Sequence, residues 1–427
     1  MIRHTPLWRS VAVLGVAGLV LTACGDGDTA ETEPKASGPA SSSAPPAGAK
    51  GDGTLKIGTL LPQTGSLAFL GPPEFAGVDL ALKDINDAGG VNGKAVEKID
   101  SDSGDTSTDT ASQSVDRLLS NDVDAIIGAA SSSVTLSVLD KVAGAGVLQI
   151  SPANTSDELT NFDDSGLYFR TAPPDVLQGR VLGDLILADG NSTVGILALQ
   201  DSYGTGLAAS TEKSITGGGG EVVETVVYDP KAASFSTEVG KIKAADPEAI
   251  AVIAFDETKK IIPELIKQGI GPDTKKIYFV DGNLANYDKD FDKGALAGVK
   301  GTLPGVASTD EFKARLLEVA PDLTEFAYAP ESYDAVILVA LAAQAAGDDS
   351  GEAIASKMQE VSAGGEKCTS FKDCLAMLED GADIDYDGIS GPVEFNEKGD
   401  PSEASVGIYE YGADNKYTFL EAKSGTI

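Results

Sequence analysis

Residues 125–151, AIIGAASSSVTLSVLDKVAGAGVLQIS, decide the fold class. Two short aliphatic runs, 125–130 and 147–151, flank an amphipathic segment at 134–143. Aliphatic runs of this length, without a polar residue at every second position, are typical of strands buried in a parallel sheet. Parallel neighbours need a crossover between them, and the middle segment is long enough to supply it as a helix. The stretch therefore predicts a right-handed strand–helix–strand unit.

The same alternation repeats along the chain. We expect further apolar strands at 55–61, 194–199, 250–255 and 276–280. We expect helices between them at 74–88, 108–119, 176–188, 234–244 and 258–268. Repeated units of this kind predict an α/β fold with two Rossmann-like lobes, each a parallel-rich sheet flanked by helices.

Breaks in the alternation predict where the chain passes between lobes. The first break is at 168–174 and the second at 300–304, after which helical patterns dominate at 311–319, 331–346 and 351–361. Strand patterns return at 393–422. Three passages predict a three-segment hinge beside a cleft. We expect lobe 1 to comprise residues 54–172 and 303–392, and lobe 2 to comprise residues 173–302 and 393–427.

The N-terminus predicts export. Arg3 and Arg9 precede an apolar run at 11–21, which is too short to span a bilayer and ends in Leu-Thr-Ala before Cys24. This pattern predicts a lipoprotein signal peptide at 1–23 and a lipid on Cys24 that anchors the chain to the outer face of the membrane. A soluble secretory signal is the alternative, and both place the protein outside the cytoplasm. Residues 24–53 are rich in Gly, Ser, Pro and Ala, which predicts a disordered tether.

Composition excludes several classes of function. The only histidine, His4, lies in the predicted signal, so the exported chain has no Ser-His-Asp relay and no imidazole metal site. Removal of the signal leaves 30 basic and 66 acidic residues, a net charge of −36, which argues against nucleic acid as a partner. Residues 58–65, GTLLPQTG, carry no phosphate-binding signature. Carboxylate-based catalysis, an oxygen-ligand metal site and plain binding remain open at this point. Among them we expect plain binding, with neither an enzyme nor a cofactor, and nothing calls for more than a monomer.

Cys368 and Cys374 predict a disulfide, because an exported chain meets an oxidising environment. Six residues of regular helix would hold the two too far apart, so a turn must lie between them. Ser370 is placed to cap a helix that starts at Phe371, with Asp373 reaching back. Two reduced thiols are the alternative.

An acidic stretch imitates a calcium-binding loop. Asp383, Asp385, Asp387 and Glu394, with Gly388 at the sixth place, match the side-chain ligands of an EF-hand. An EF-hand needs a helix on both sides, whereas the residues after this loop read as a strand. We expect an acidic turn at the third hinge segment and no metal site.

Two polar clusters follow neighbouring predicted strands. Ser131, Ser132 and Ser133 follow the strand at 125–130, and Thr155 closes the run after the strand at 147–151. The carboxyl ends of parallel strands are where open α/β sheets bind ligands, and hydroxyls with free backbone N–H groups suit a carboxylate. Helix capping is the alternative for each cluster, with Thr155 and Glu158 as a capping box in the second.

Several ordered segments resemble the branched-chain amino-acid binding proteins of ABC importers, which have the type I periplasmic binding fold. The resemblance covers about residues 55–421. It rests on the following segments: LLPQTG at 60–65, INDAGGVNG at 85–93, the serine run, SPA at 151–153, FRT at 169–171, GP at 391–392 and GD at 399–400.

The resemblance implies a set of ligand-binding residues. It places the ligand carboxylate on Ser131 and Thr155, with the main-chain carbonyl of Ala153 helping to orient the ammonium. It matches Tyr203 to a tyrosine of the opposing lobe and Asp281, or its neighbour Gly282, to the position that binds the ammonium. The following residues complete the implied site: Phe69 and Leu70 where the family has an aromatic, Phe255 in lobe 2, and Asp175 near the first crossover.

The implied function is solute capture for an ABC importer. The ligand would be a small zwitterion, a branched-chain or other aliphatic amino acid, delivered to the permease subunits. Leu70 in place of the family aromatic, and Ala254-Phe255 where some members carry tyrosine, alter the pocket. An amide, urea or aromatic-acid carrier, which Asn154 would permit, and a ligand-sensing module for a membrane receptor are therefore the alternatives. A carboxylate-dependent hydrolase is a further one from another class.

Overall fold

The computed structural model describes residues 50–427. The predicted signal peptide, the lipidation site Cys24 and the tether up to residue 49 lie outside the described residues. None of the described helices is long and apolar enough to cross a membrane.

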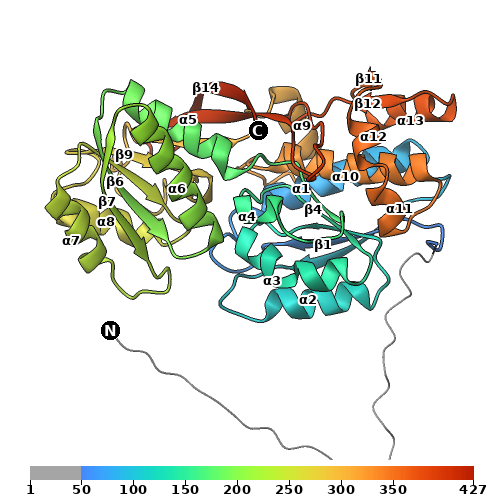
Figure 1. Ribbon diagram of the computed structural model, residues 1–427, viewed down its shortest axis with the longest axis horizontal. Coiled ribbons are helices and arrows are strands. Elements are labelled where there is room, and N and C mark those ends of the chain that lie inside the picture. The colour runs from blue at the N-terminus through green and yellow to red at the C-terminus, as the bar shows by residue number, and fades with distance from the viewer. Residues whose placement is uncertain (1–49) are drawn as a thin grey trace, which may run out of the picture. The chain divides into compact units, whose positions relative to one another are not determined.

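Lobe 1 is built on a five-stranded sheet in which all neighbouring strands are parallel. The sheet order β2-β1-β3-β4-β5 joins β1 (Lys56–Leu61), β2 (Glu97–Asp102), β3 (Ala125–Gly128), β4 (Leu148–Ser151) and β5 (Tyr168–Arg170). Helices α2 (Thr110–Leu119) and α3 (Ser132–Ala143) cover one face, and α1 (Gly71–Asp87) and α10 (Ala329–Ala346) cover the other (Figure 1). Apolar side chains of α10 are buried along almost its whole length, so this helix is the centre of the lobe.

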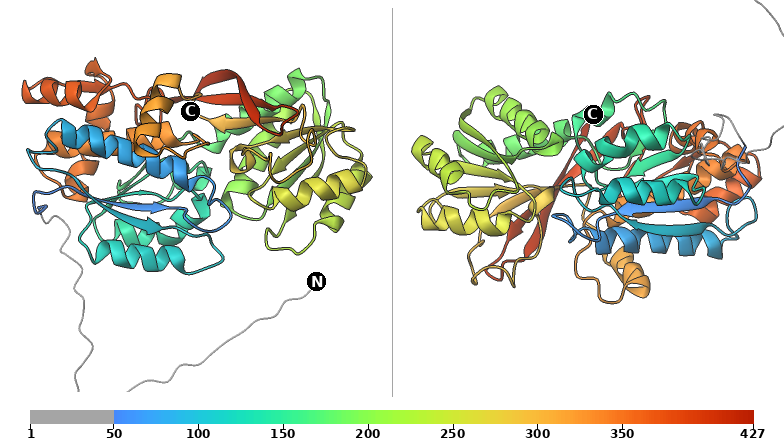
Figure 2. Two further views of the ribbon diagram at one scale, coloured as in Figure 1. Left: turned by 180° about the vertical axis from the view of Figure 1, so that it is seen from behind. Right: turned by 90° about the horizontal axis from the view of Figure 1, so that it is seen from below.

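Lobe 2 is built on a seven-stranded sheet of order β14-β13-β10-β9-β8-β6-β7. The parallel strands are β6 (Thr193–Leu199), β7 (Glu221–Tyr228), β8 (Ala249–Ile253), β9 (Lys276–Phe279) and β10 (Lys300–Pro304). Two antiparallel strands, β13 (Glu403–Tyr411) and β14 (Tyr417–Thr426), complete the sheet. Helices α5 (Asp175–Ala188) and α6 (Ser202–Gly217) lie on one face, and α7 (Ser236–Ala245) and α8 (Thr258–Lys267) lie on the other (Figure 2).

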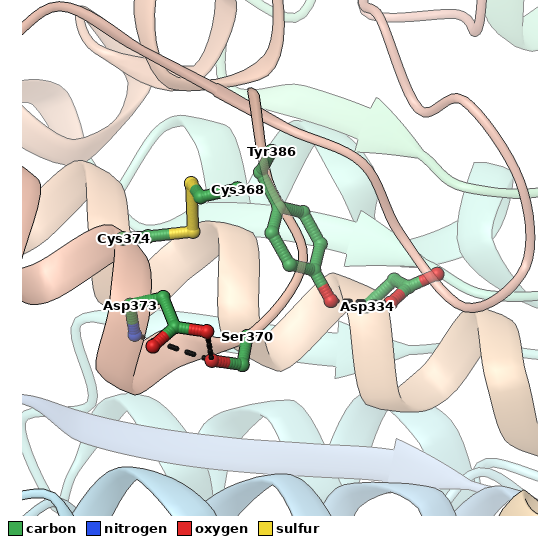
Figure 3. Close-up of a disulfide and its surroundings, with 6 residues drawn as sticks. All are labelled: Asp334, Cys368, Ser370, Asp373, Cys374 and Tyr386. Carbon is green, nitrogen blue, oxygen red and sulfur yellow. Dashed lines mark hydrogen bonds between the residues drawn. A yellow bond between two sulfur atoms is a disulfide. The ribbon is translucent and has the colours of Figure 1, made fainter. Parts of the chain in front are cut away.

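The remaining elements are short. They are α4 (Asp157–Thr160), the 3-10 turn η1 (Asp281–Asn283), α9 (Asp310–Val319), α11 (Gly351–Ala355), α12 (Met358–Ser362), β11 (Glu366–Cys368), α13 (Phe371–Glu379) and β12 (Ile384–Tyr386). One disulfide joins Cys368 to Cys374, with 5.4 Å between the Cα atoms, as predicted (Figure 3). Ser370 caps α13 as predicted: its hydroxyl accepts from the Asp373 N–H at 3.2 Å and donates to the Asp373 carboxylate at 2.8 Å.

The α/β fold of two lobes is confirmed, but two elements differ from the sequence-based prediction. The single helix expected at 351–361 is wrong, because the chain breaks at residues 356–357 into α11 and α12. Strand β10, Lys300–Pro304, pairs over its whole length within the lobe 2 sheet, so the expected boundary between residues 302 and 303 falls inside a strand. The other lobe boundaries stay predictions.

Candidate functional site

The carboxyl ends of the two sheets place polar side chains around one small cavity. In lobe 1, Ser131 follows β3, and Ala153 and Thr155 follow β4, its parallel neighbour. In lobe 2, Tyr203 opens α6 after β6, and Asp281 follows β9. The complete lining is Leu67, Leu70, Ala130, Ser131, Ser132, Ala153, Thr155, Tyr203, Phe255, Asp281, Gly282 and Tyr328. We call this set the cleft cavity.

The lobes are in contact around the cleft cavity. Its volume is about 10 Å³, the space that a single water needs. Across the lobes, Ser133 Oγ lies 2.8 Å from Ser202 Oγ and accepts from the Ser202 N–H at 3.2 Å. Leu67 and Leu70 of lobe 1 belong to the same buried apolar cluster as the lobe 2 core. The structure is therefore a closed arrangement in which side chains fill the cleft.

Asp281 is the acid of the cleft cavity lining, and its carboxylate accepts three side-chain hydrogen bonds. Its Oδ1 accepts from Tyr203 Oη and Gln178 Nε2, both at 2.8 Å, and its Oδ2 accepts from Tyr328 Oη at 2.7 Å. The residue is buried, and this burial raises the pKa of its carboxyl despite the opposing effect of the three donors. All three donors are neutral, so no cation compensates this carboxylate through a hydrogen bond.

Asp175 is a second buried acid close to Asp281. Neither of its carboxyl oxygens accepts a hydrogen bond of ordinary geometry from the described residues, although the Thr155 hydroxyl faces this carboxyl. Burial raises its pKa well above the ordinary value, the charge of Asp281 raises it further, and the Thr155 hydroxyl lowers it. Asp175 does not line the cleft cavity itself; it lies at the start of α5, where its N–H donates to the Thr155 carbonyl at 2.7 Å. Two neighbouring acids with raised pKa values thus lie at this end of the cleft, and neither is in an ion pair among the described residues.

The capping box expected for Thr155 and Glu158 is wrong. Ser156, one residue later, caps α4 by accepting from the Glu158 N–H at 3.3 Å. The Thr155 hydroxyl lines the cleft cavity, is buried, and makes no hydrogen bond of ordinary geometry among the described residues. It faces the Asp175 carboxyl, whose pKa burial raises and this hydroxyl lowers.

Ser131 and Ser132 of the serine run make different hydrogen bonds. Ser131 caps α3, its hydroxyl accepting from the Val134 N–H at 3.4 Å, and it also lines the cleft cavity. Ser132 Oγ accepts from the N–H groups of Thr155 and Ser156 at 3.3 and 3.2 Å, which fixes the loop after β4 against α3. The helix-capping and ligand-facing alternatives for Ser131 are therefore compatible.

Other residues chosen from the sequence lie at different distances from the cavity. Leu70 lines it, whereas Phe69 lines a separate cavity beside Tyr287 and Lys259, so the structure does not bring Phe69 to the cleft. Phe255 stacks on Tyr203 with 5.4 Å between ring centroids. Asn154 donates to the Ala129 and Ala130 carbonyls at 2.9 Å, so its amide serves lobe 1 rather than the cavity.

Sequence reasoning missed Tyr328 and Gln178. Tyr328 stands before α10 with a positive φ of 60°, a conformation that costs energy for a residue with a side chain. Pro330 in the first turn of α10 was a visible helix-start signal, and an aromatic just ahead of it was the available clue. Gln178 gives no such signal, because a glutamine inside an amphipathic helix is ordinary.

Lys367 of β11 lies among the carboxylates of the acidic stretch at 383–394. Lys367 Nζ lies 2.8 Å from Asp387 Oδ1 and 3.2 Å from Asp385 Oδ2, and it approaches Glu394 at 3.9 Å. Asp383 contributes its carbonyl to the Glu366 N–H, and β12 runs through the middle of the stretch. No group of acids, cysteines or histidines between residues 50 and 427 has the arrangement of a metal site.

Comparison with known proteins identifies the family. The sequence pattern of the periplasmic binding proteins matches residues 54–369. The chain belongs to the periplasmic binding protein family. It is 29% identical over 379 residues to Leu/Ile/Val-binding protein homolog 1 of Brucella abortus, covering 86% of this chain and 93% of that protein. This family consists of solute-binding proteins, not enzymes, that act outside the cytoplasm with ABC transporter components.

Solved structures share the fold of this periplasmic binding protein. The branched-chain amino acid binding protein LivJ of Streptococcus pneumoniae, in complex with isoleucine, has a TM-score of 0.71 at 23% identity, covering 88% of this chain and 100% of that chain. A solute-binding protein of R. palustris in complex with benzoate has a TM-score of 0.70 at 19% identity, covering 88% and 97%. At these identities the likeness shows the fold, and the ligand has to be argued from the site itself.

Proposed function

We propose that the chain binds an aliphatic α-amino acid, such as leucine, isoleucine or valine, between its lobes and delivers it to an ABC permease. The observation that carries this proposal is the buried pair Asp281 and Asp175, which faces the polar strand ends of lobe 1 without a compensating cation. A ligand ammonium supplies the missing positive charge. The Ala153 carbonyl, at the same cavity, is a further acceptor for it.

The carboxylate of the ligand fits the lobe 1 side of the cavity. The Thr155 hydroxyl, which faces the Asp175 carboxyl without a hydrogen bond of ordinary geometry, can turn to donate to the ligand, and the Ser131 hydroxyl can donate while it accepts from Val134. Both lie beside the N-terminus of α3, whose unpaired N–H groups favour negative charge. The two charged groups of an amino acid therefore match the two sides of the cleft in sign.

The side chain of the ligand fits the apolar part of the lining. Leu67, Leu70, Ala130 and Phe255 contribute no charge, so an aliphatic side chain meets no unpaired polar group there. The cavity of about 10 Å³ is far smaller than an amino acid, so the lobes must separate and Tyr203 and Tyr328 must move to admit it. Ligand bound to both lobes then stabilises the closed state, which is the form that the permease would receive.

An aromatic carboxylate is the second candidate, since the R. palustris relative was solved with benzoate. Its charge argues against it here, because it brings an anion and no cation to the acids of lobe 2. The amide carrier loses its main support, since Asn154 is engaged within lobe 1. Lipid attachment at Cys24 and service as a sensor for a membrane receptor stay proposals that depend on residues or partners beyond this site.

The test compares ligands that differ by one charged group. Titration calorimetry would measure leucine, 4-methylpentanoate, which lacks the ammonium, isoamylamine, which lacks the carboxylate, and benzoate. The protein is first unfolded and refolded to remove carried-over ligand. The proposal expects leucine to bind at least about a hundredfold more tightly than either truncated analogue, since loss of the ammonium leaves the buried acids without a cation and loss of the carboxylate leaves the buried hydroxyls of lobe 1 without an acceptor. Benzoate binding with no response to leucine would overturn it.

A further inference from the structure

A second cavity, which we call the hinge pocket, has a volume of about 340 Å³ and shares Tyr328 with the cleft cavity. Its walls come from the end of β10 with residues 306–308, from residues 324–331 at the start of α10, and from β13 and β14. Segments that pass between the lobes therefore meet here. Unlike the cleft cavity, this pocket has room for a small molecule without any rearrangement.

Aromatic rings form one side of the hinge pocket. Tyr409 packs edge-on against Tyr417 and Phe419, with centroid distances of 5.4 and 5.5 Å, and Phe326 lies in the same lining. The faces of such rings attract cations. Lys313 shows this attraction within the pocket, because its Nζ lies 5.6 Å from the centroid of Phe326.

A buried carboxylate that joins no ion pair among the described residues forms the other side. Glu331 is 2% exposed and lines the pocket, and among the described residues its side chain joins no ion pair and no hydrogen bond to another residue. A Cβ on Gly305 would lie 2.0 Å from Glu331 Oε1, so the glycine leaves room for the carboxylate between two pocket residues, Pro304 and Val306. Burial, with a contribution from the charge of Asp334, raises the pKa of Glu331 to about 8, while a hydrogen bond from the backbone N–H of Glu331 itself lowers it.

The other charged residues of the pocket are accounted for. Glu325 accepts from the Asn286 N–H at 2.9 Å and from Tyr417 Oη at 2.8 Å. Lys313, the cation in this part of the described lining, lies over Phe326 and is not within ion-pair distance of Glu331. Neither carboxylate of the described lining is in an ion pair, but Glu325 accepts two hydrogen bonds from other residues whereas Glu331 accepts none, so Glu331 is the one left for a cation next to the aromatic rings.

We propose that the hinge pocket is a second binding site, separate from the cleft, for a small organic cation with an alkylammonium group. Glu331 is its counter-charge, and Tyr409, Tyr417 and Phe419 surround its methyl groups. The strong negative charge of the chain raises the local concentration of such cations. Because the occupant touches β10, α10 and β13 together, it favours the lobe arrangement seen here over any that separates these walls.

The test uses tetramethylammonium chloride as the probe, titrated into the whole chain without amino acid, with sodium chloride of equal ionic strength as the blank. We expect binding in the millimolar range that Glu331→Gln weakens at least about fivefold, since the variant removes the charge and keeps the shape. Phe419→Ala, at a side chain that is 44% exposed and so safe for folding, should weaken it about threefold. Glu397→Gln, an exposed acid outside the pocket, should leave it unchanged.

Two results would overturn the proposal. One is the absence of tetramethylammonium binding beyond the sodium chloride blank. The other is binding that Asp281→Asn abolishes while Glu331→Gln and Phe419→Ala leave it intact, which would place the cation in the cleft. Neither result bears on amino-acid binding, which the leucine titration tests separately.

Discussion

Two buried charged clusters in this protein are built in opposite ways. Arg170 and Asp400 form an ion pair at 2.6 Å with side chains 0% and 1% exposed. The guanidinium also donates to the Ser156 carbonyl at 2.9 Å and to Thr160 Oγ1 at 2.7 Å, so its charge is fully satisfied by Asp400 and by these two residues of lobe 1. Asp281 and Asp175 are equally buried, yet no cation joins them. We infer from this comparison that the Arg170–Asp400 ion pair stabilises the fold, and we propose that the Asp281 and Asp175 pair binds a cationic group of the ligand.

The largest expected effect comes from breaking the satisfied cluster. Arg170→Met leaves Asp400 buried without its partner, so the free energy of unfolding should fall by about 3–5 kcal/mol. Urea unfolding followed by circular dichroism measures it. In the double variant Arg170→Met with Asp400→Leu the loss should be smaller than the sum of the two single losses. A loss below about 1 kcal/mol for Arg170→Met would show that the cluster does not hold the lobe together.

The uncompensated cluster should respond in the opposite way. Asp281→Asn keeps the shape of the side chain and removes its charge, so leucine affinity should fall about a hundredfold, or about 2.7 kcal/mol, while stability without ligand is kept. Titration calorimetry and urea unfolding on the same samples separate the two effects. Glu257→Gln, a buried acid of lobe 2 outside the cavity lining, is the control. Unchanged leucine affinity in Asp281→Asn would remove this residue from the site.

Two hydroxyls of lobe 1, those of Ser132 and Thr155, allow the same comparison between a group that stabilises the fold and a group that binds the ligand. Ser132→Ala removes the acceptor of two buried N–H groups, so it should lower the free energy of unfolding by about 1–3 kcal/mol. Thr155→Val removes a hydroxyl that faces the Asp175 carboxyl without a hydrogen bond of ordinary geometry, so stability should fall by less than in Ser132→Ala while leucine affinity falls about tenfold. Equal losses of stability in both variants would mean that the Thr155 hydroxyl has a structural partner.

The smallest effect concerns pH. In the unfolded chain Asp175 ionises near pH 4, whereas burial and Asp281 raise its pKa in the folded state. The folded state then holds the extra proton, so stability without ligand falls as pH rises from about 4 towards the raised pKa. Asp175→Asn should remove this fall, gaining about 1 kcal/mol at pH 8 and little at pH 4. The exposed Asp140→Asn is the control, and equal pH profiles of wild type and Asp175→Asn would contradict the assignment.

The sequence predicted the strands that are buried on both faces, because their aliphatic runs leave no other place for them. It did not reveal β2, whose sequence EKIDSD is polar because the strand lies at the sheet edge. It also did not reveal α6, a polar and glycine-rich helix, or β7, the half-exposed strand at the edge of the lobe 2 sheet. Edge elements carry weak apolar patterns, and their partners become visible only in three dimensions.

The site divides in a similar way. Strand ends in sequence order pointed to Ser131 and Thr155, since parallel strands bring their carboxyl ends to one edge, whereas Asp281 followed only from the resemblance to the family. Tyr328 and Gln178 reach Asp281 from segments 47 and 103 residues away, and no local pattern encodes such a contact. The shift of the cap from Thr155 to Ser156 depends on one residue of register, which sequence patterns do not resolve.

The most direct test of the uncompensated pair is proton release on ligand binding. Titration calorimetry of leucine near pH 6, in buffers that differ in ionisation enthalpy, counts the protons exchanged. A ligand ammonium beside Asp281 and Asp175 lowers their raised pKa values, so up to one proton per bound leucine should leave the protein, and fewer in Asp175→Asn. Proton uptake, or no exchange at any pH from 5 to 8, would contradict the claim that this pair receives the ammonium.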